Sequence, residues 1–151
     1  MRCEQVGGRR SIPIIDIFAG PGGLGEGFSS LADELGQRAF RLALSVEKEA
    51  VACQTLRLRA VRRHLAEAGH LDTYYEFLRG GIDRPAFDEL PFVREALREA
   101  NEEVMNAELG KCPAATVDSR IRSALAGETD WVLIGGPPCQ AYSLAGRARR
   151  A

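Results

Sequence analysis

The chain of 151 residues is 45% hydrophobic and 27% charged, which is ordinary for a soluble globular domain with a buried core. Its formal net charge of −1 excludes an overall basic character of the kind that attracts nucleic acid non-specifically. No apolar run is long enough to span a bilayer, and residues 1–10 lack the apolar core of a secretory signal. We therefore expect a cytoplasmic domain without a membrane partner.

The cysteines stand at positions 3, 53, 112 and 139 and form no Cys-x-x-Cys pair, so we predict neither a metal site nor a dithiol redox motif. In a reducing compartment such thiols stay free and can act as nucleophiles. Cys53 is expected in the core of a helix. The arginines between Arg57 and Arg63 are interpreted as a solvated face of that helix.

Apolar strands and amphipathic helices alternate along the chain. The first strand is expected at Ile14–Phe18, and a helix follows in which leucine and phenylalanine recur at helical spacing from Leu24 to Leu35. The remaining expected elements are a strand at Phe40–Val46, a long helix from Lys48 to about Ala68, a weak third strand at Ala115–Val117, a helix at Ser119–Ala126 and a strand at Trp131–Gly135. This alternation predicts an α/β fold with a parallel sheet and right-handed crossovers.

Residues 69–113 interrupt the alternation. They contain two aromatic segments, Tyr74–Leu78 and Phe87–Leu90, and a helical run from Phe92 to Leu109. They show no internal repeat and no low-complexity tract. We interpret them as a helical insertion at the edge of an incomplete parallel sheet.

The first predicted strand opens into a glycine-rich turn, residues 16–25, Asp-Ile-Phe-Ala-Gly-Pro-Gly-Gly-Leu-Gly. Glycines let a ligand approach the main chain, and the helix that follows leaves backbone N–H groups free. Glu47, at the end of the next strand, is placed to accept both hydroxyls of a ribose. The spacing departs from the Gly-x-Gly-x-x-Gly pattern of dinucleotide folds, and a tight turn without a ligand is the alternative.

A second turn, residues 135–140, Gly-Gly-Pro-Pro-Cys-Gln, follows the last predicted strand. Its two prolines fix φ and remove two backbone donors, so the turn is stiff. It would present Cys139 at the carboxyl end of a strand, where open α/β sheets carry their chemistry. A thiolate there is a nucleophile toward an electron-poor carbon, and Gln140 and Ser143 add hydrogen-bonding groups. The alternative is an inert core cysteine, which the adjoining prolines disfavour.

The two turns resemble motifs of the cytosine-C5 DNA methyltransferases. Residues 16–25 are similar to the cofactor-binding motif of that family, and residues 136–143 are similar to its catalytic motif. The resemblance covers Ile14–Val51 and Thr116–Arg147 and leaves out the predicted insertion. It implies a Rossmann-like, S-adenosylmethionine-dependent methyltransferase fold, with residues 1–151 as the amino-terminal part of a catalytic domain.

The resemblance also implies a mechanism and a set of site residues. A cytosine flipped out of double-stranded DNA is attacked at C6 by Cys139, and C5 then takes the methyl group of S-adenosylmethionine. Glu47 matches the acidic position that holds the ribose, and Asp118 matches the aspartate that meets the adenine amino group. The other residues implied at the cofactor are Asp16, Phe18, Gly20, Gly22, Gly23, Leu24 and Pro137, and those implied at the base are Pro138, Gln140 and Ser143.

Several segments of that family, including a Glu-Asn-Val motif and a DNA-reading domain, do not occur in this sequence. We therefore expect that the polypeptide alone does not methylate DNA, and that it binds DNA mostly through regions supplied elsewhere, for example by a complementing chain. Three alternatives stand beside this interpretation: a non-catalytic module that binds S-adenosylmethionine or a partner, half of a split methyltransferase, and an unrelated nucleotide-binding domain. A transfer-RNA substrate, used by a branch with the same motifs, is a further alternative to DNA.

Overall fold

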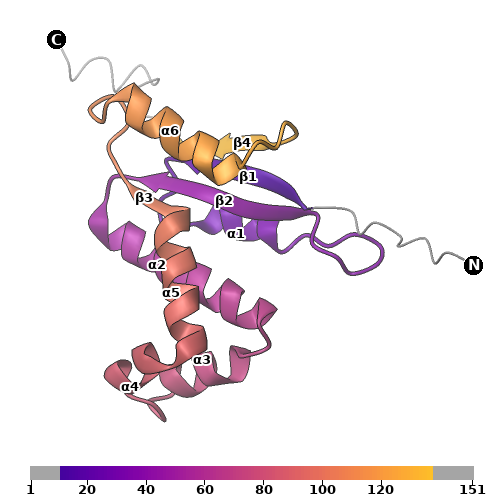
Figure 1. Ribbon diagram of the computed structural model, residues 1–151, viewed down its shortest axis with the longest axis vertical. Helices are drawn as coiled ribbons and strands as arrows, with labels where there is room; N and C mark the ends of the chain where they lie inside the picture. The colour runs from indigo at the N-terminus through magenta and orange to yellow at the C-terminus, as the bar shows by residue number, and fades with distance from the viewer. Residues whose placement is uncertain (1–10, 138–151) are drawn as a thin grey trace, which may run out of the picture.

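The computed structural model describes residues 11–137, which form a parallel four-stranded sheet with helices on both faces (Figure 1). The strands are β1 (Ile12–Ile17), β2 (Phe40–Glu47), β3 (Val104–Asn106) and β4 (Val132–Gly135), and their order across the sheet is β3-β2-β1-β4. All three neighbouring pairs are parallel. The predicted Rossmann-like α/β class is confirmed.

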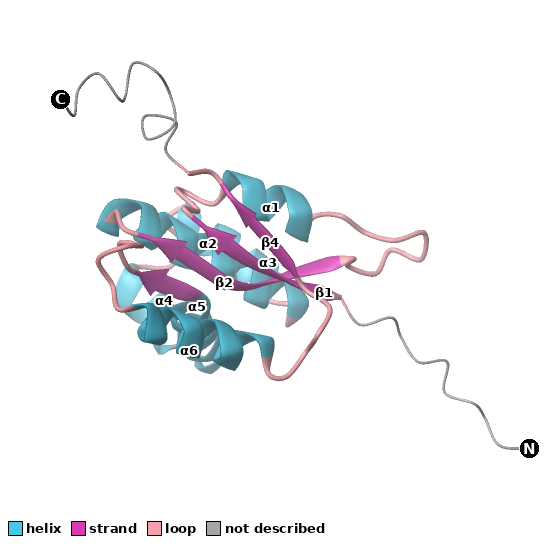
Figure 2. Cartoon of the chain, turned by 90° about the horizontal axis from the view of Figure 1, so that it is seen from above, coloured by secondary structure: helices cyan, strands magenta, loops and turns pink. Residues whose placement is uncertain are grey.

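Helices cover the two faces of the sheet in the arrangement that right-handed crossovers require. Helix α1 (Gly23–Ser29) and helix α6 (Ala114–Leu125) lie on opposite sides of the sheet (Figure 2). Leu125 of α6 packs with Ile15, Leu44 and Val46. On the other side, α2 (Ala50–Glu67) packs against the turn after β1 and against β3 through Cys53 and Leu56. The expected core position of Cys53 is confirmed.

The connection between β2 and β3 carries three further helices. These are α3 (Leu71–Leu78), α4 (Arg84–Glu89) and α5 (Pro91–Glu103), and they form a group below the sheet in Figure 1. Together with α2 they have a hydrophobic core of their own, made by Ala60, Val61, Leu65, Tyr74, Phe87, Val93, Ala96 and Ala100. The helices therefore do not depend on the sheet alone for burial.

Two predicted elements are wrong in this region. The helical run expected to reach Leu109 ends at Glu103, because Val104 is buried and pairs with Ser45 of β2 as the first residue of β3. The third strand expected at Ala115–Val117 is the first turn of α6. Its apolar run is too short to separate a strand from a helix by periodicity, and alanine favours the helix.

The first helix is shorter than predicted. Helix α1 ends at Ser29, and Leu35, which was expected on its apolar face, is 82% exposed. The carboxylate of Asp33 accepts hydrogen bonds from the backbone N–H groups of Leu35 and Gln37, at 2.9 and 2.8 Å. This side-chain turn offers the backbone an alternative to the helix and ends the helical pattern.

Candidate functional site

The carboxyl ends of the four strands meet at one edge of the sheet, which is the predicted place for a ligand. Strand β1 ends at Ile17 and leads through residues 18–22 into α1. Strand β2 ends at Glu47, β3 at Asn106 and β4 at Gly135. The candidate site is built from these four ends.

The turn after β1 is held in an unusual backbone conformation. Phe18, Gly20 and Gly22 have φ of 56°, 56° and 88°, in the left-handed region. Such a φ is strained for phenylalanine and is found where the surrounding structure or function demands it. The Phe18 side chain remains 36% exposed, so this turn offers an aromatic ring at the sheet edge.

The glycines of the turn serve two different purposes. A Cβ at Gly22 would lie 2.7 Å from a methyl carbon of Leu56, and a Cβ at Gly25 would lie 2.9 Å from a methyl carbon of Leu42. These two positions therefore need glycine so that α1 and the turn can pack. A Cβ at Gly20 or at Gly23 would meet no atom within 4 Å. Their backbone stays open to a ligand.

Glu47 joins the end of β2 to the turn after β1. Its Oε2 accepts a hydrogen bond from the backbone N–H of Gly20, at 2.7 Å. Its Oε1 accepts from the N–H groups of Lys48 and Glu49, at 2.8 and 2.9 Å. The structure thus brings the predicted acidic residue together with the predicted glycine turn, and it fixes the orientation of the carboxylate.

Asp16 is the second carboxylate of the site, and it is only 1% exposed. Neither of its side-chain oxygens has a hydrogen-bond partner among the described residues. Burial, and to a lesser degree the charge of Glu47, raises the pKa of Asp16 from 3.8 to about 6. In the β1–β2 register Asp16 pairs with Ser45, whose buried hydroxyl likewise has no partner among the residues described. A buried polar group without a partner calls for a functional explanation.

Asn106 is a site residue that the sequence analysis missed. Its side-chain Nδ2 donates to the carbonyl oxygens of Glu47 and Lys48, at 3.0 and 2.9 Å, and lies 3.3 Å from Sγ of Cys53. These contacts hold the loop that carries the Glu47 carboxylate. The three residues of β3 lie inside the predicted helical run, so no periodicity distinguished them.

Asp118 lies within α6 and does not follow a strand. It is an exposed residue in the second turn of α6, because the strand that was expected to present it does not form. Its side chain forms no hydrogen bond or ion pair with the other residues that the structure describes. Its expected contact with an adenine amino group stays a prediction, and the strand end at that position of the sheet belongs to Asn106.

The start of the cysteine turn lies beside the glycine turn. Gly135 pairs with Ile17 in the β1–β4 register, and a Cβ at Gly135 would lie only 2.3 Å from the carbonyl oxygen of Ile17. A Cβ at Gly136 would lie 3.9 Å from the carbonyl oxygen of Phe18. The two motifs are therefore adjacent at the sheet edge at Gly135 and Gly136. Four predicted site residues, Pro138, Cys139, Gln140 and Ser143, lie outside the described residues.

Neither a metal cluster nor a membrane span is found in the part of the chain that the structure describes. Within residues 11–137, no group of three or more His, Cys, Asp or Glu side chains could hold a metal ion. No helix in the same range has the length and apolar character needed to cross a membrane.

Comparison with known proteins gives one significant relative. No family model matches the chain, and no solved structure matches it either. The chain is 34% identical, over an alignment 154 positions long, to the Type II methyltransferase M.Bpa9945I of Bacillus paralicheniformis. The match covers 90% of this chain, which spans 32% of the length of that relative. The chain is therefore similar, over most of its own length, to about a third of that methyltransferase.

Proposed function

We propose that the chain provides the cofactor-binding and nucleophile part of a DNA (cytosine-5-)-methyltransferase. The observation that carries the proposal is the contact between the two motif-bearing turns: Gly135 packs against Ile17 directly before the glycine turn that Glu47 holds. A cofactor seated on the glycine turn would lie next to a reactive group carried by the turn after β4. The similarity to a Type II methyltransferase supports the methyltransferase part of this proposal.

The residues of the turn fit S-adenosylmethionine. The open backbone at Gly20 and Gly23 leaves room for the ligand, and Phe18 offers an exposed ring to a flat adenine. Glu47 is oriented to accept ribose hydroxyls. The unpartnered, buried carboxyl of Asp16 adds negative charge near a ligand that carries a sulfonium and an ammonium group. When bound, S-adenosylmethionine supplies an electrophilic methyl group.

In the proposed mechanism the chain contributes a nucleophile and its positioning. The thiolate of Cys139 adds to C6 of an extruded cytosine, which makes C5 nucleophilic toward the methyl group. Once the methyl carbon has exchanged its bond to sulfur for a bond to C5, a base takes the C5 proton, and elimination of the cysteine from C6 regenerates the thiolate. The Pro137-Pro138 pair fixes φ at two positions, which would limit the number of conformations in which the turn presents the thiol to a methyl donor.

Double-stranded DNA is the proposed substrate, and the segments that read its sequence are proposed to lie in the part of the protein that corresponds to the rest of M.Bpa9945I. Residues 69–113 are proposed to be an insertion within the catalytic domain. Three helices with a shared core support this division, although β3 falls inside the same bounds and belongs to the sheet.

Two measurements test the proposal. Calorimetric titration of the chain with S-adenosylmethionine should show binding, and titration with a nicotinamide dinucleotide should not. Binding of the dinucleotide alone would assign the turn to an unrelated nucleotide-binding domain. Cytosine-5 chemistry is tested in the protein that includes the DNA-reading segments. DNA carrying 5-fluorocytosine should give a covalent adduct with the natural protein and none with Cys139→Ser, because fluorine at C5 blocks the final proton loss.

A further inference from the structure

A cavity lies between α2, α4 and α5, on residues that the proposed reaction does not use. Its volume is about 640 Å³, a size that suits a small organic ligand. The walls include side chains from all three helices, among them Arg57 and Gln54 of α2, Arg84 and Phe87 of α4, and Asn101 of α5. None of its lining residues is acidic. The charged groups of its lining are therefore two guanidinium groups, of which Arg84 also forms an ion pair with Asp88.

Arg57 carries the first of the two guanidinium groups that line the cavity. The Nε of Arg57 is buried and has no hydrogen-bond partner among residues 11–137. No carboxylate of the described residues forms an ion pair with this arginine. A buried donor without an acceptor costs free energy, and a bound anion would remove that cost.

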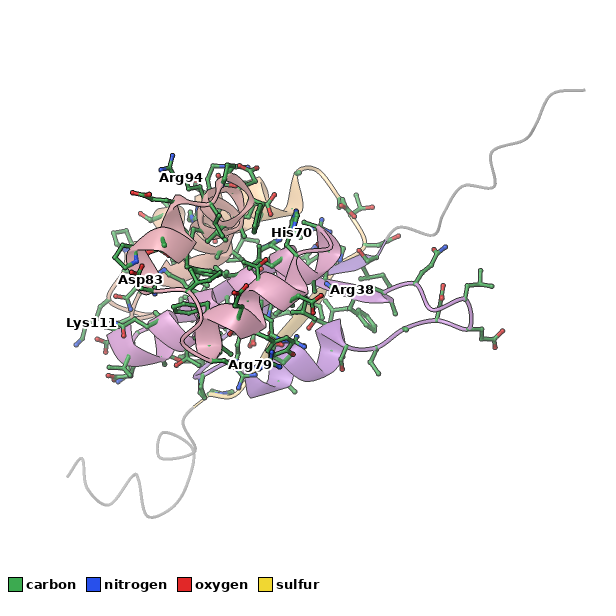
Figure 3. All side chains as sticks on the ribbon, turned by 90° about the horizontal axis from the view of Figure 1, so that it is seen from below. Arg38, His70, Arg79, Asp83, Arg94 and Lys111 are labelled. Carbon is green, nitrogen blue, oxygen red and sulfur yellow. The ribbon has the colours of Figure 1, made fainter. Side chains whose placement is uncertain are left out.

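Arg84 carries the second guanidinium group of the cavity. It lies on α4, which two contacts hold in place. Asp83, which Figure 3 labels, caps α4 by accepting a hydrogen bond from the N–H of Ala86 at 2.8 Å. Phe87 anchors the same helix by stacking on Phe77, with 4.4 Å between ring centroids. Arg84 pairs with Asp88 through Nε, and its terminal nitrogens have no acceptor among the residues described.

The rest of the cavity combines apolar and amide surface. Val61, Phe87 and Leu97 belong to or pack against the helical core, and they give the cavity an apolar floor. Gln54 and Asn101 add amide groups that can both donate and accept hydrogen bonds. An apolar surface with two guanidinium forks and two amides matches a ligand that joins a phosphate to a ring system.

We propose that the cavity between α2, α4 and α5 binds a nucleotide through its phosphate, with Arg57 and Arg84 as the phosphate ligands. The nucleotide is either free or part of a DNA strand, since the phosphate chemistry is the same. The site is distinct from the strand-end site and does not depend on the methyltransferase proposal.

Calorimetry on the 151-residue chain tests this site with deoxycytidine monophosphate, deoxycytidine and a short DNA duplex. We expect the monophosphate to bind and the nucleoside to bind at least about tenfold more weakly, since a charged hydrogen bond is lost. Arg57→Gln and Arg84→Gln should each weaken phosphate binding by a similar factor of about ten. The affinity of Arg57→Lys for the monophosphate should lie between those of the natural chain and Arg57→Gln, because lysine keeps the charge but lacks the planar guanidinium group.

The matched control is Arg122→Gln, which changes an exposed arginine of α6 on the other side of the sheet. This variant should bind the monophosphate as tightly as the natural chain does. Binding of the duplex alone, lost in both arginine variants, would assign the site to a DNA strand. Affinity that is independent of Arg57 and Arg84, or equal for nucleoside and nucleotide, would overturn the proposal. Titration with S-adenosylmethionine in parallel separates this result from the proposed function. Thermal unfolding shows whether Arg57→Gln still folds. If it does not, Arg84→Gln provides the test, because the Arg84 side chain is exposed.

Discussion

The carboxylate of Glu47 accepts a hydrogen bond from the backbone N–H of Gly20, with 2.7 Å between Oε2 and the nitrogen. This bond joins the end of β2 to the turn after β1, two segments that are 27 residues apart in the sequence. It holds the glycine turn in place before any ligand arrives. The acidic side chain therefore has two functions, as a structural acceptor and as a proposed ribose acceptor.

Replacing Glu47 should weaken the binding of S-adenosylmethionine. Glu47→Ala removes a charged acceptor, and the expected loss of binding free energy is about 1.5–3 kcal/mol, measured by calorimetry. Glu49→Gln is the matched control, because that side chain is exposed and forms only a surface ion pair with Lys48. Equal affinity of Glu47→Ala and the natural chain would remove Glu47 from the ribose site.

The buried carboxyl of Asp16 predicts a pH dependence of stability. Its pKa is raised from 3.8 to about 6, so the folded state binds a proton more tightly than the unfolded state does. The free energy of unfolding should therefore fall as the pH rises from about 4 to about 6, and stay lower above that range. Asp16→Asn should flatten this slope in denaturant titrations at several pH values.

Asp118→Asn is the control for that experiment, since Asp118 is exposed on α6. It should leave the pH dependence unchanged. An identical slope for Asp16→Asn and the natural chain would mean that Asp16 is not the group that titrates. Saturation with S-adenosylmethionine should also reduce the slope, because a nearby cation favours the charged carboxylate.

Two glycines of α1 give a paired test of packing. A Cβ at Gly25 would lie 2.9 Å from a methyl carbon of Leu42 and 3.0 Å from Oδ2 of Asp16. Gly25→Ala should therefore destabilise the fold by roughly 1–3 kcal/mol in a denaturant titration. A Cβ at Gly27 would meet no atom within 4 Å, so Gly27→Ala should stabilise the helix by about 0.5–1 kcal/mol. The packing argument fails if both variants have the same stability.

The buried Arg63 predicts a large cost for its removal. Arg63 is 6% exposed and forms ion pairs with Glu26 of α1 and with Glu103 at the end of α5. Arg63→Met would leave Glu103 buried without this partner, and we expect a loss of about 3–5 kcal/mol in unfolding free energy. Arg98→Gln, which breaks exposed ion pairs with Glu95 and Glu102, should lower the unfolding free energy far less than Arg63→Met does. Similar costs for the two variants would refute the role of burial.

The sequence predicted the parts of the fold that local pattern encodes. Strands β1, β2 and β4 and helix α2 lie close to their expected positions, because each is a clear apolar run or a long periodic segment. These elements need no knowledge of distant contacts. The approach of the two motif turns is different, because it depends on the pairing of β1 with β4, which the sequence analysis did not predict.

What the sequence did not predict depends on partners that are far apart in the chain. Strand β3 has three residues, and Val104 becomes a strand residue only because β2 offers it a pairing edge. Arg63 was expected on a solvated face, and this expectation is wrong because α1 and α5 close over it. The orphaned oxygens of Asp16 and the contacts of Asn106 are likewise products of packing.

The central position of β1 has a consequence for the order of folding. Ile14 pairs with Leu42 on one side and with Val132 on the other, so the second pairing closes a far longer loop than the first. Loop closure over a longer stretch costs more entropy and slows folding. We expect β1 and β2 to associate early and β4 to join late. The edge of the site that β4 contributes, next to the proposed nucleophile, is then completed last, beside a glycine turn that is already in place.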